Sequence, residues 1–146
     1  LHLFPPDDSV KYRKLISSMQ ELDKRAFKPM EDGVADDKRT KVAEQESVPA
    51  LTTMREKFKE TATYILPPDL YEHRDLYEKY IDLRIDYTKK WIYGYRTDNV
   101  SMDSVIGNTA LELYLVERKL RQNILTTTLP PVPNLPEYQF QHPYNQ

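Results

Sequence analysis

The residues best suited to metal chemistry lie at the start of a predicted helix, around positions 69–73. Asp69 and His73 are four positions apart, which places both side chains on one face of a helix, with Glu72 beside them. A metal site in a helical bundle needs several inward ligands, such as a recurring Glu-x-x-His pattern, and none appears in the sequence. We therefore expect His73 to be a capping or surface residue, and we expect no metal and no cofactor.

Patterns that carry other catalytic chemistry are also missing from the sequence. It contains no Gly-rich phosphate loop, no Gly-x-Ser-x-Gly motif, no convincing Ser/His/Asp grouping and no cysteine. Carboxylates are plentiful, but they stand beside lysine and arginine on faces that we expect to be solvated. The sequence therefore predicts a protein that is not an enzyme.

Arg84 is the charged residue whose position most needs an explanation. At roughly 100° of rotation per residue, it falls inside the apolar arc of the helix predicted from about residue 69 to 95. A guanidinium keeps its charge, so it needs an acceptor when it is buried. Glu117 lies in the apolar face of the next predicted helix, within about one turn of Arg84 once the two helices fold back on each other. Our hypothesis is a buried Arg84–Glu117 pair. The alternatives are that one or both charges contact a partner subunit, or that both reach solvent.

Tyrosine is abundant, with 11 residues, and many of them lie in the same helix as Arg84. Aromatic rings stack on nucleobases, and the helix also carries basic residues, but interleaved acidic residues would repel phosphate. Tyrosine equally suits a protein interface, because it buries a large area and keeps a polar tip. We therefore expect other protein subunits as partners and no direct binding of nucleic acid. The candidate partner-binding residues in this helix are Tyr77, Tyr80, Ile81, Ile85, Trp91 and Tyr95.

Proline-rich segments at both ends of the chain are a second indication of partners. Residues 130–136 contain two overlapping Pro-x-x-Pro spacings, which favour the polyproline II conformation that peptide-recognition grooves bind. The flanking arginine usual in such ligands is missing, so a stiff strap across a protein surface, or a spacer, is the stronger interpretation. The candidate contact residues of these arms are Phe4, Pro130, Pro131, Pro133, Pro136, Tyr138 and Phe140.

Helices must position these residues, because apolar residues recur at helical spacing and strand-like alternation is almost absent. We expect an all-α protein of about four helices, with extended Pro-rich termini. The third and fourth helices form a long antiparallel hairpin, with Gly94 or Asn99 in a left-handed conformation at the turn. The expected divisions are an N-terminal arm (1–8), a first helix (9–28), a charged, exposed linker (29–46), a core of three helices (47–125) and a Pro/aromatic tail (126–146).

Composition sets the remaining bounds. The 146 residues suffice for one domain, with 30% charged residues, 39% hydrophobic residues and a mean hydropathy of -0.73, which is polar for a self-contained globule. The net charge of -2 and pI near 6.0 do not indicate a duplex-binding protein. No apolar run approaches the roughly 20 residues of a membrane span. The chain begins with Leu1, so we expect a processed form or a fragment, located inside the cell in a compartment that the sequence leaves open.

These observations favour a structural role. We expect a non-catalytic subunit of a larger multiprotein complex, most simply a hetero-oligomer, that binds neighbours through helical faces and extended Pro-rich arms. One alternative is an adaptor that presents its Pro-rich C-terminal segment to a recognition domain. The other is a helical protein associated with nucleic acid, whose binding would weaken steeply with salt.

Overall fold

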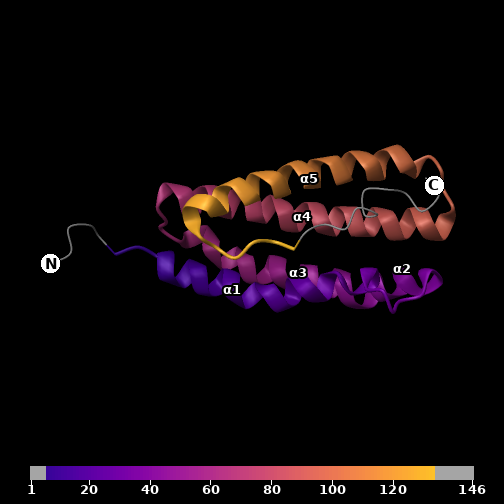
Figure 1. The fold of residues 1–146 in the computed structure, drawn as a ribbon, viewed down its shortest axis with the longest axis horizontal. Coiled ribbons are helices and arrows are strands. Elements are labelled where there is room, and N and C mark those ends of the chain that lie inside the picture. The colour runs from indigo at the N-terminus through magenta and orange to yellow at the C-terminus, as the bar shows by residue number, and fades with distance from the viewer. Residues whose placement is uncertain (1–5, 134–146) are drawn as a thin grey trace.

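The described part of the protein is a bundle of four long helices. A computed structural model describes residues 6–133, in which all regular secondary structure is helical. The long helices are α1 (Ser9–Ala26), α3 (Val48–Phe58), α4 (Pro68–Thr97) and α5 (Met102–Thr127). Successive long helices run in opposite directions along the long axis of the bundle (Figure 1). The predicted all-α class is confirmed.

The α4–α5 hairpin is the largest contact between elements of the bundle, and its two helices are antiparallel (Figure 1). α4 begins at Pro68, because proline suits the first turn of a helix and keeps the residue before it, here Pro67, out of the helical conformation. Asp98 ends α4 in the left-handed conformation, with φ of 50°, and its N–H donates to the Gly94 carbonyl. The expectation that Gly94 or Asn99 takes this conformation is wrong. Aspartate is one of the few residues that visit it at small cost.

The expected linker of residues 29–46 is largely helical. Two short 3-10 turns, η1 (Lys28–Met30) and η2 (Asp36–Lys38), lead into α2 (Arg39–Val42), the π-helical turn η3 (Ala43–Ser47) and then α3 without interruption, while η4 (Lys59–Thr63) follows α3. Thr40, Ala43 and Ser47 are buried on one side of this segment. Pro49 has no N–H to donate into the turn before it, which accounts for the departure from regular α-helix just upstream. High charge therefore marks one exposed face of a helix here, rather than a linker.

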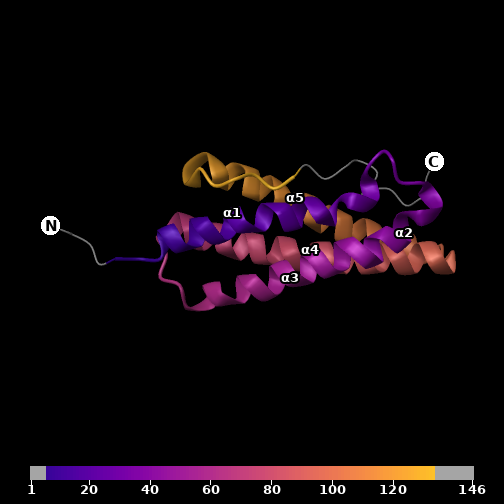
Figure 2. The same cartoon turned by 90° about the horizontal axis from the view of Figure 1, so that it is seen from below.

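The chain returns across the bundle after α5. Thr128 is left-handed, with φ of 57°, and the next residues, 129–133, here called the strap, run beside α1 (Figure 2). α1 packs on α3, α3 on α4 and α4 on α5, whereas α1 and α5 share few direct contacts. The strap buries Leu129 and Val132, and Arg13 of α1 donates a 2.6 Å hydrogen bond to the Thr127 carbonyl. The strap thus closes the open side of the bundle. Phe4, Pro136, Tyr138 and Phe140 lie outside the described residues.

If the strap closes the bundle, removing its anchor destabilises the whole domain. We expect Leu129→Ala to lower the free energy of unfolding by about 2–4 kcal/mol, because the side chain is only 3% exposed. Urea denaturation followed by circular dichroism measures the change. Leu125→Ala is the matched control, because Leu125 is 82% exposed and should cost less than about 0.5 kcal/mol in dilute solution. Equal losses in the two variants would show that the strap does not contribute to the fold.

Candidate functional site

The most polar part of the core surrounds Arg84. Its guanidinium forms an ion pair with the Asp23 carboxylate of α1, and its Nη1 donates to the Tyr80 hydroxyl at 3.0 Å. The Tyr80 hydroxyl in turn donates to both Asp23 oxygens at 3.2 Å. All three side chains are almost completely buried, and the Phe27 ring lies 4.1 Å from the guanidinium carbon. The charge therefore has a carboxylate, a hydroxyl and an aromatic face around it.

The predicted Arg84–Glu117 pair is wrong, because Arg84 pairs with Asp23. Both residues are buried, but Glu117 pairs with Arg121 of its own helix, at 2.5 Å, and Arg84 points toward α1. Asp23 was findable in the sequence, since it follows Tyr12, Ile16 and Met19 on one helical stripe, where a carboxylate is as anomalous as Arg84. The hypothesis failed because Arg84 lies on the side of α4 that contacts α1, not on the side that contacts α5.

Burial and ion pairing shift the pKa values of Asp23 and Arg84 in opposite directions. Burial raises the pKa of the Asp23 carboxyl above its ordinary value, and the nearby Arg84 and Tyr80 oppose that rise. Burial lowers the pKa of Arg84, but Tyr80 and Asp23 outweigh it, so the pKa is raised overall and the guanidinium stays charged. Since the guanidinium cannot be neutralised, we assign the ionised form to Asp23 in direct contact with it.

A second polar contact joins α1 to the N-terminal part of α4. The Tyr12 hydroxyl and His73 Nδ1 are 2.6 Å apart, and the imidazole stacks on the Tyr77 ring at 5.5 Å. His73 is 1% exposed, so the expectation of a capping or surface histidine is wrong. Burial, with a contribution from the charge of Arg13, lowers the pKa of His73 to about 4. The imidazole is therefore neutral at pH 7 and serves as a hydrogen-bonding core residue.

The aromatic arc of α4 packs inside the protein. Tyr77, Tyr80, Ile81, Ile85 and Trp91 are all buried, while Tyr95 is half-buried with its ring 6.2 Å from that of Trp91. Five of the six helical residues proposed for partner binding thus contact this chain's own core. Of the candidate strap residues, Pro131 is exposed and Pro130 and Pro133 are half-buried. A partner surface on a helix has to be sought elsewhere.

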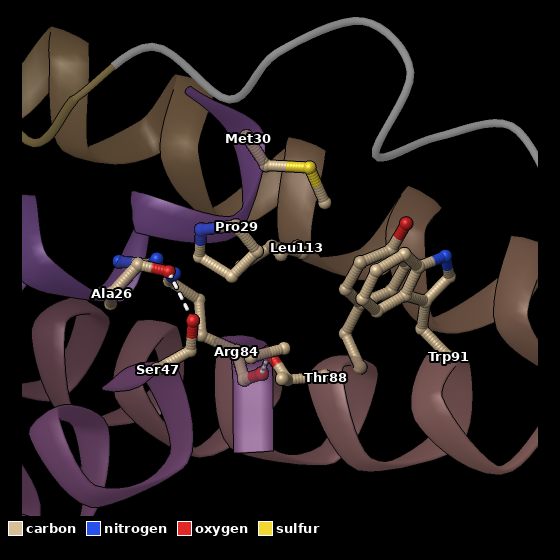
Figure 3. Close-up of a pocket in the computed structure, with 10 residues that line it drawn as sticks. Ala26, Pro29, Met30, Ser47, Arg84, Thr88, Trp91 and Leu113 are labelled. Carbon is tan, nitrogen blue, oxygen red and sulfur yellow. Dashed lines mark hydrogen bonds between the residues drawn. The ribbon is translucent and has the colours of Figure 1, made fainter. Parts of the chain in front are cut away.

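The cavity beside Arg84 is too small for an organic ligand. It measures about 20 Å³ and lies between α1, α4 and η3, with Ser47, Arg84, Thr88 and Trp91 among its lining residues (Figure 3). Ser47 donates to the Ala26 carbonyl and Thr88 to the Arg84 carbonyl, both at 2.7 Å. One water molecule fits such a space. Within residues 6–133, no three His, Cys, Asp or Glu side chains gather as a metal site would require.

The outward face of α5 is the most apolar exposed surface of a described helix. Leu111, Leu115 and Leu125 are 57%, 48% and 82% exposed, and Tyr114 is 40% exposed. At roughly 100° per residue these four side chains share one stripe, here called the α5 outer face. The exposed Arg118 and Gln122 lie within it, between Leu115 and Leu125. Leu113, Val116 and Leu120 point the opposite way, into the bundle. α5 therefore has two apolar faces, of which residues 6–133 cover one.

Comparison with known proteins adds no relative. No protein-family model matches the chain, and no curated protein and no solved structure matches it significantly.

None of the helices within the described range combines the length and hydropathy of a membrane span. Among the described helices, α5 carries the largest group of exposed large apolar side chains.

The Arg84–Asp23 assignment predicts a specific energetic coupling. Asp23→Leu leaves a buried guanidinium without its carboxylate, and we expect a loss of about 3–5 kcal/mol in unfolding free energy. Arg84→Met added to Asp23→Leu should recover most of this loss, because an apolar pair replaces the ionic one. Glu117→Gln is the control and should show less than about 0.5 kcal/mol of coupling to Arg84→Met. A larger coupling to Glu117 than to Asp23 would overturn the assignment.

The buried imidazole predicts how stability varies with pH. In the unfolded chain His73 titrates near its ordinary pKa of 6.5, and in the folded protein near 4. Between these values the unfolded state binds more protons, so stability rises with pH in this window and levels off above it. The contribution of His73 is at most about 3 kcal/mol. Denaturation midpoints from pH 4 to 7 in wild type and His73→Gln test this, because the variant should lose that part of the slope. Parallel curves would show that His73 does not titrate in this way.

Proposed function

We propose that this chain is a non-catalytic helical subunit that binds a neighbouring protein through the α5 outer face. The observation that carries the proposal is the exposure of Leu111, Leu115 and Leu125 on one side of a helix whose opposite side is fully packed. Isolated exposed leucines are ordinary, but Leu111, Tyr114 and Leu115 are exposed together on adjacent turns, and such an apolar patch is typical of an interaction surface.

The polar core supports the same proposal. The buried Asp23–Arg84–Tyr80 cluster fixes α1 against α4, and Arg13 of α1 donates a hydrogen bond to the Thr127 carbonyl at the end of α5. A rigid bundle presents a helical face in a defined shape, which lowers the entropic cost of binding.

The two alternatives have less support. An adaptor would need its Pro-x-x-Pro segment accessible, whereas the first such spacing, Pro130 to Pro133, lies in the strap, which is anchored by the buried Leu129 and Val132. The second spacing and the aromatic residues after it lie outside the described range. Nucleic-acid association likewise stays a prediction.

The proposal is tested by placing charge on the α5 outer face. We expect tagged protein carrying Leu111→Glu and Leu115→Glu to capture at least about tenfold less of the proteins recovered with wild type, because two anchors become charged. Val10→Glu is the matched control, on an exposed valine of α1, and should capture as wild type does. Circular dichroism and thermal melting establish that all three proteins are folded. Equal capture by the double variant and the wild type would contradict the proposal.

A further inference from the structure

A groove of about 280 Å³ lies between α1 and the strap. The apolar residues that line it are Ile16 of α1 and Pro130, Pro131, Val132 and Pro133 of the strap. Gln20 and Lys24 also line it, and both are exposed. Its volume is just below the roughly 300–1,000 Å³ of pockets that bind small organic compounds. Unlike the cavity beside Arg84, the groove therefore has room for a compound with a single ring.

Tyr77 of α4 also lines the groove, and its hydroxyl is unused by the described chain. The residue is only 4% exposed, and no described residue forms a hydrogen bond with the hydroxyl. Burial raises the pKa of Tyr77 well above its ordinary value, and the nearby Asp23 raises it further, so the hydroxyl is protonated. Buried hydroxyls without a partner are rare, because leaving water costs free energy that no hydrogen bond then offsets. A ligand atom that accepts from this hydroxyl would remove that cost.

Asp23 of α1 is the second buried polar residue of the groove. Its carboxylate accepts from Arg84 and Tyr80, whereas an ionised carboxylate offers about four acceptor positions. Because Arg84 already balances its charge, a ligand cation would be repelled by the guanidinium and a ligand anion by the carboxylate. Either ion would also lose its hydration. This part of the groove therefore favours a neutral group that both accepts and donates a hydrogen bond, as a hydroxyl does.

The polar and apolar parts of the groove together define one class of ligand. Water molecules would bond to the two polar residues but would leave the apolar walls in contact with water, whereas a ring between Ile16 and Val132 covers them. We propose that the groove binds a small neutral compound that carries a hydroxyl group on an apolar ring. The ligand hydroxyl accepts from Tyr77 and donates to Asp23. The site shares no residue with the α5 outer face and is independent of the proposed function.

The first test varies the probe compound. para-Propylphenol should bind the full chain with a Kd between micromolar and millimolar, as expected for a compound of this size, and should raise the melting temperature. para-Propylanisole cannot donate and para-propylbenzoate is charged, so each should bind at least about tenfold more weakly. Isothermal titration calorimetry measures the three Kd values. Nuclear Overhauser effects from the ring protons of the phenol to the methyl groups of Ile16 and Val132 locate the site.

The second test removes the hydroxyl from the protein. Tyr77→Phe keeps the ring, and we expect it to weaken para-propylphenol at least about tenfold. It should not lower the melting temperature of the free protein, because the hydroxyl has no described partner to lose. Tyr71→Phe is the matched control on the same helix. Its hydroxyl donates to the Tyr64 carbonyl, and the residue does not line the groove, so the variant should bind the phenol as wild type does.

Four outcomes overturn the inference. They are no binding of para-propylphenol at millimolar concentration, equal affinity for the phenol and the anisole, equal affinity of wild type and Tyr77→Phe, and Overhauser effects to the α5 leucines in place of Ile16 and Val132. The Leu111→Glu and Leu115→Glu double variant should bind the phenol as wild type does. Failure of this site and failure of the proposed function are therefore distinguishable.

Discussion

The buried guanidinium of Arg84 is the constraint on which the arrangement of helices depends. It cannot lose its charge, so the fold has to place a carboxylate within reach inside the bundle, and α1 supplies Asp23. Such pairs often contribute little net stability compared with apolar side chains of similar size. We infer that this pair acts mainly on specificity. A sliding of α1 along α4 by one turn would keep many apolar contacts but would leave two buried charges unpaired.

This placement of α1 explains where the aromatic residues of α4 go. The backbone of α4 lies close to the backbones of α3 and α5, whereas α4 contacts α1 through the side chains of Arg84 and Tyr80. A helix with neighbours on three sides needs a wide apolar arc to fill the space between them. Phe58, Tyr77 and Tyr80 accordingly form a chain of ring contacts in the interior. The richness in tyrosine that suggested an interface is therefore a property of the core.

The sequence predicts which side chains of a helix point into the bundle, but it does not predict which other helix packs against them. Helical periodicity predicted the class, the hairpin and the inward direction of Arg84 and Glu117, because one helix fixes its own faces. It did not predict which helix lies opposite each face, so Asp23 was missed although it interrupts an apolar stripe just as Arg84 does. The segment at residues 39–47 was missed because its buried side chains are small or polar, such as Thr40 and Ala43, and carry a weak periodic signal.

Gly107 connects the fold to the unfilled side of α5. A glycine inside a helix costs about 1 kcal/mol relative to alanine, and Gly107 lies in the second turn of α5 (Met102–Thr127). Nothing in the described chain approaches the position that a side chain would occupy, so the monomer's own packing does not account for the residue. Glycine allows another backbone or a bulky side chain to come close. Among the described residues, this open position and the exposed leucines of the α5 outer face lie on one side of one helix, so the helix backbone is most accessible on the side where its apolar side chains are exposed.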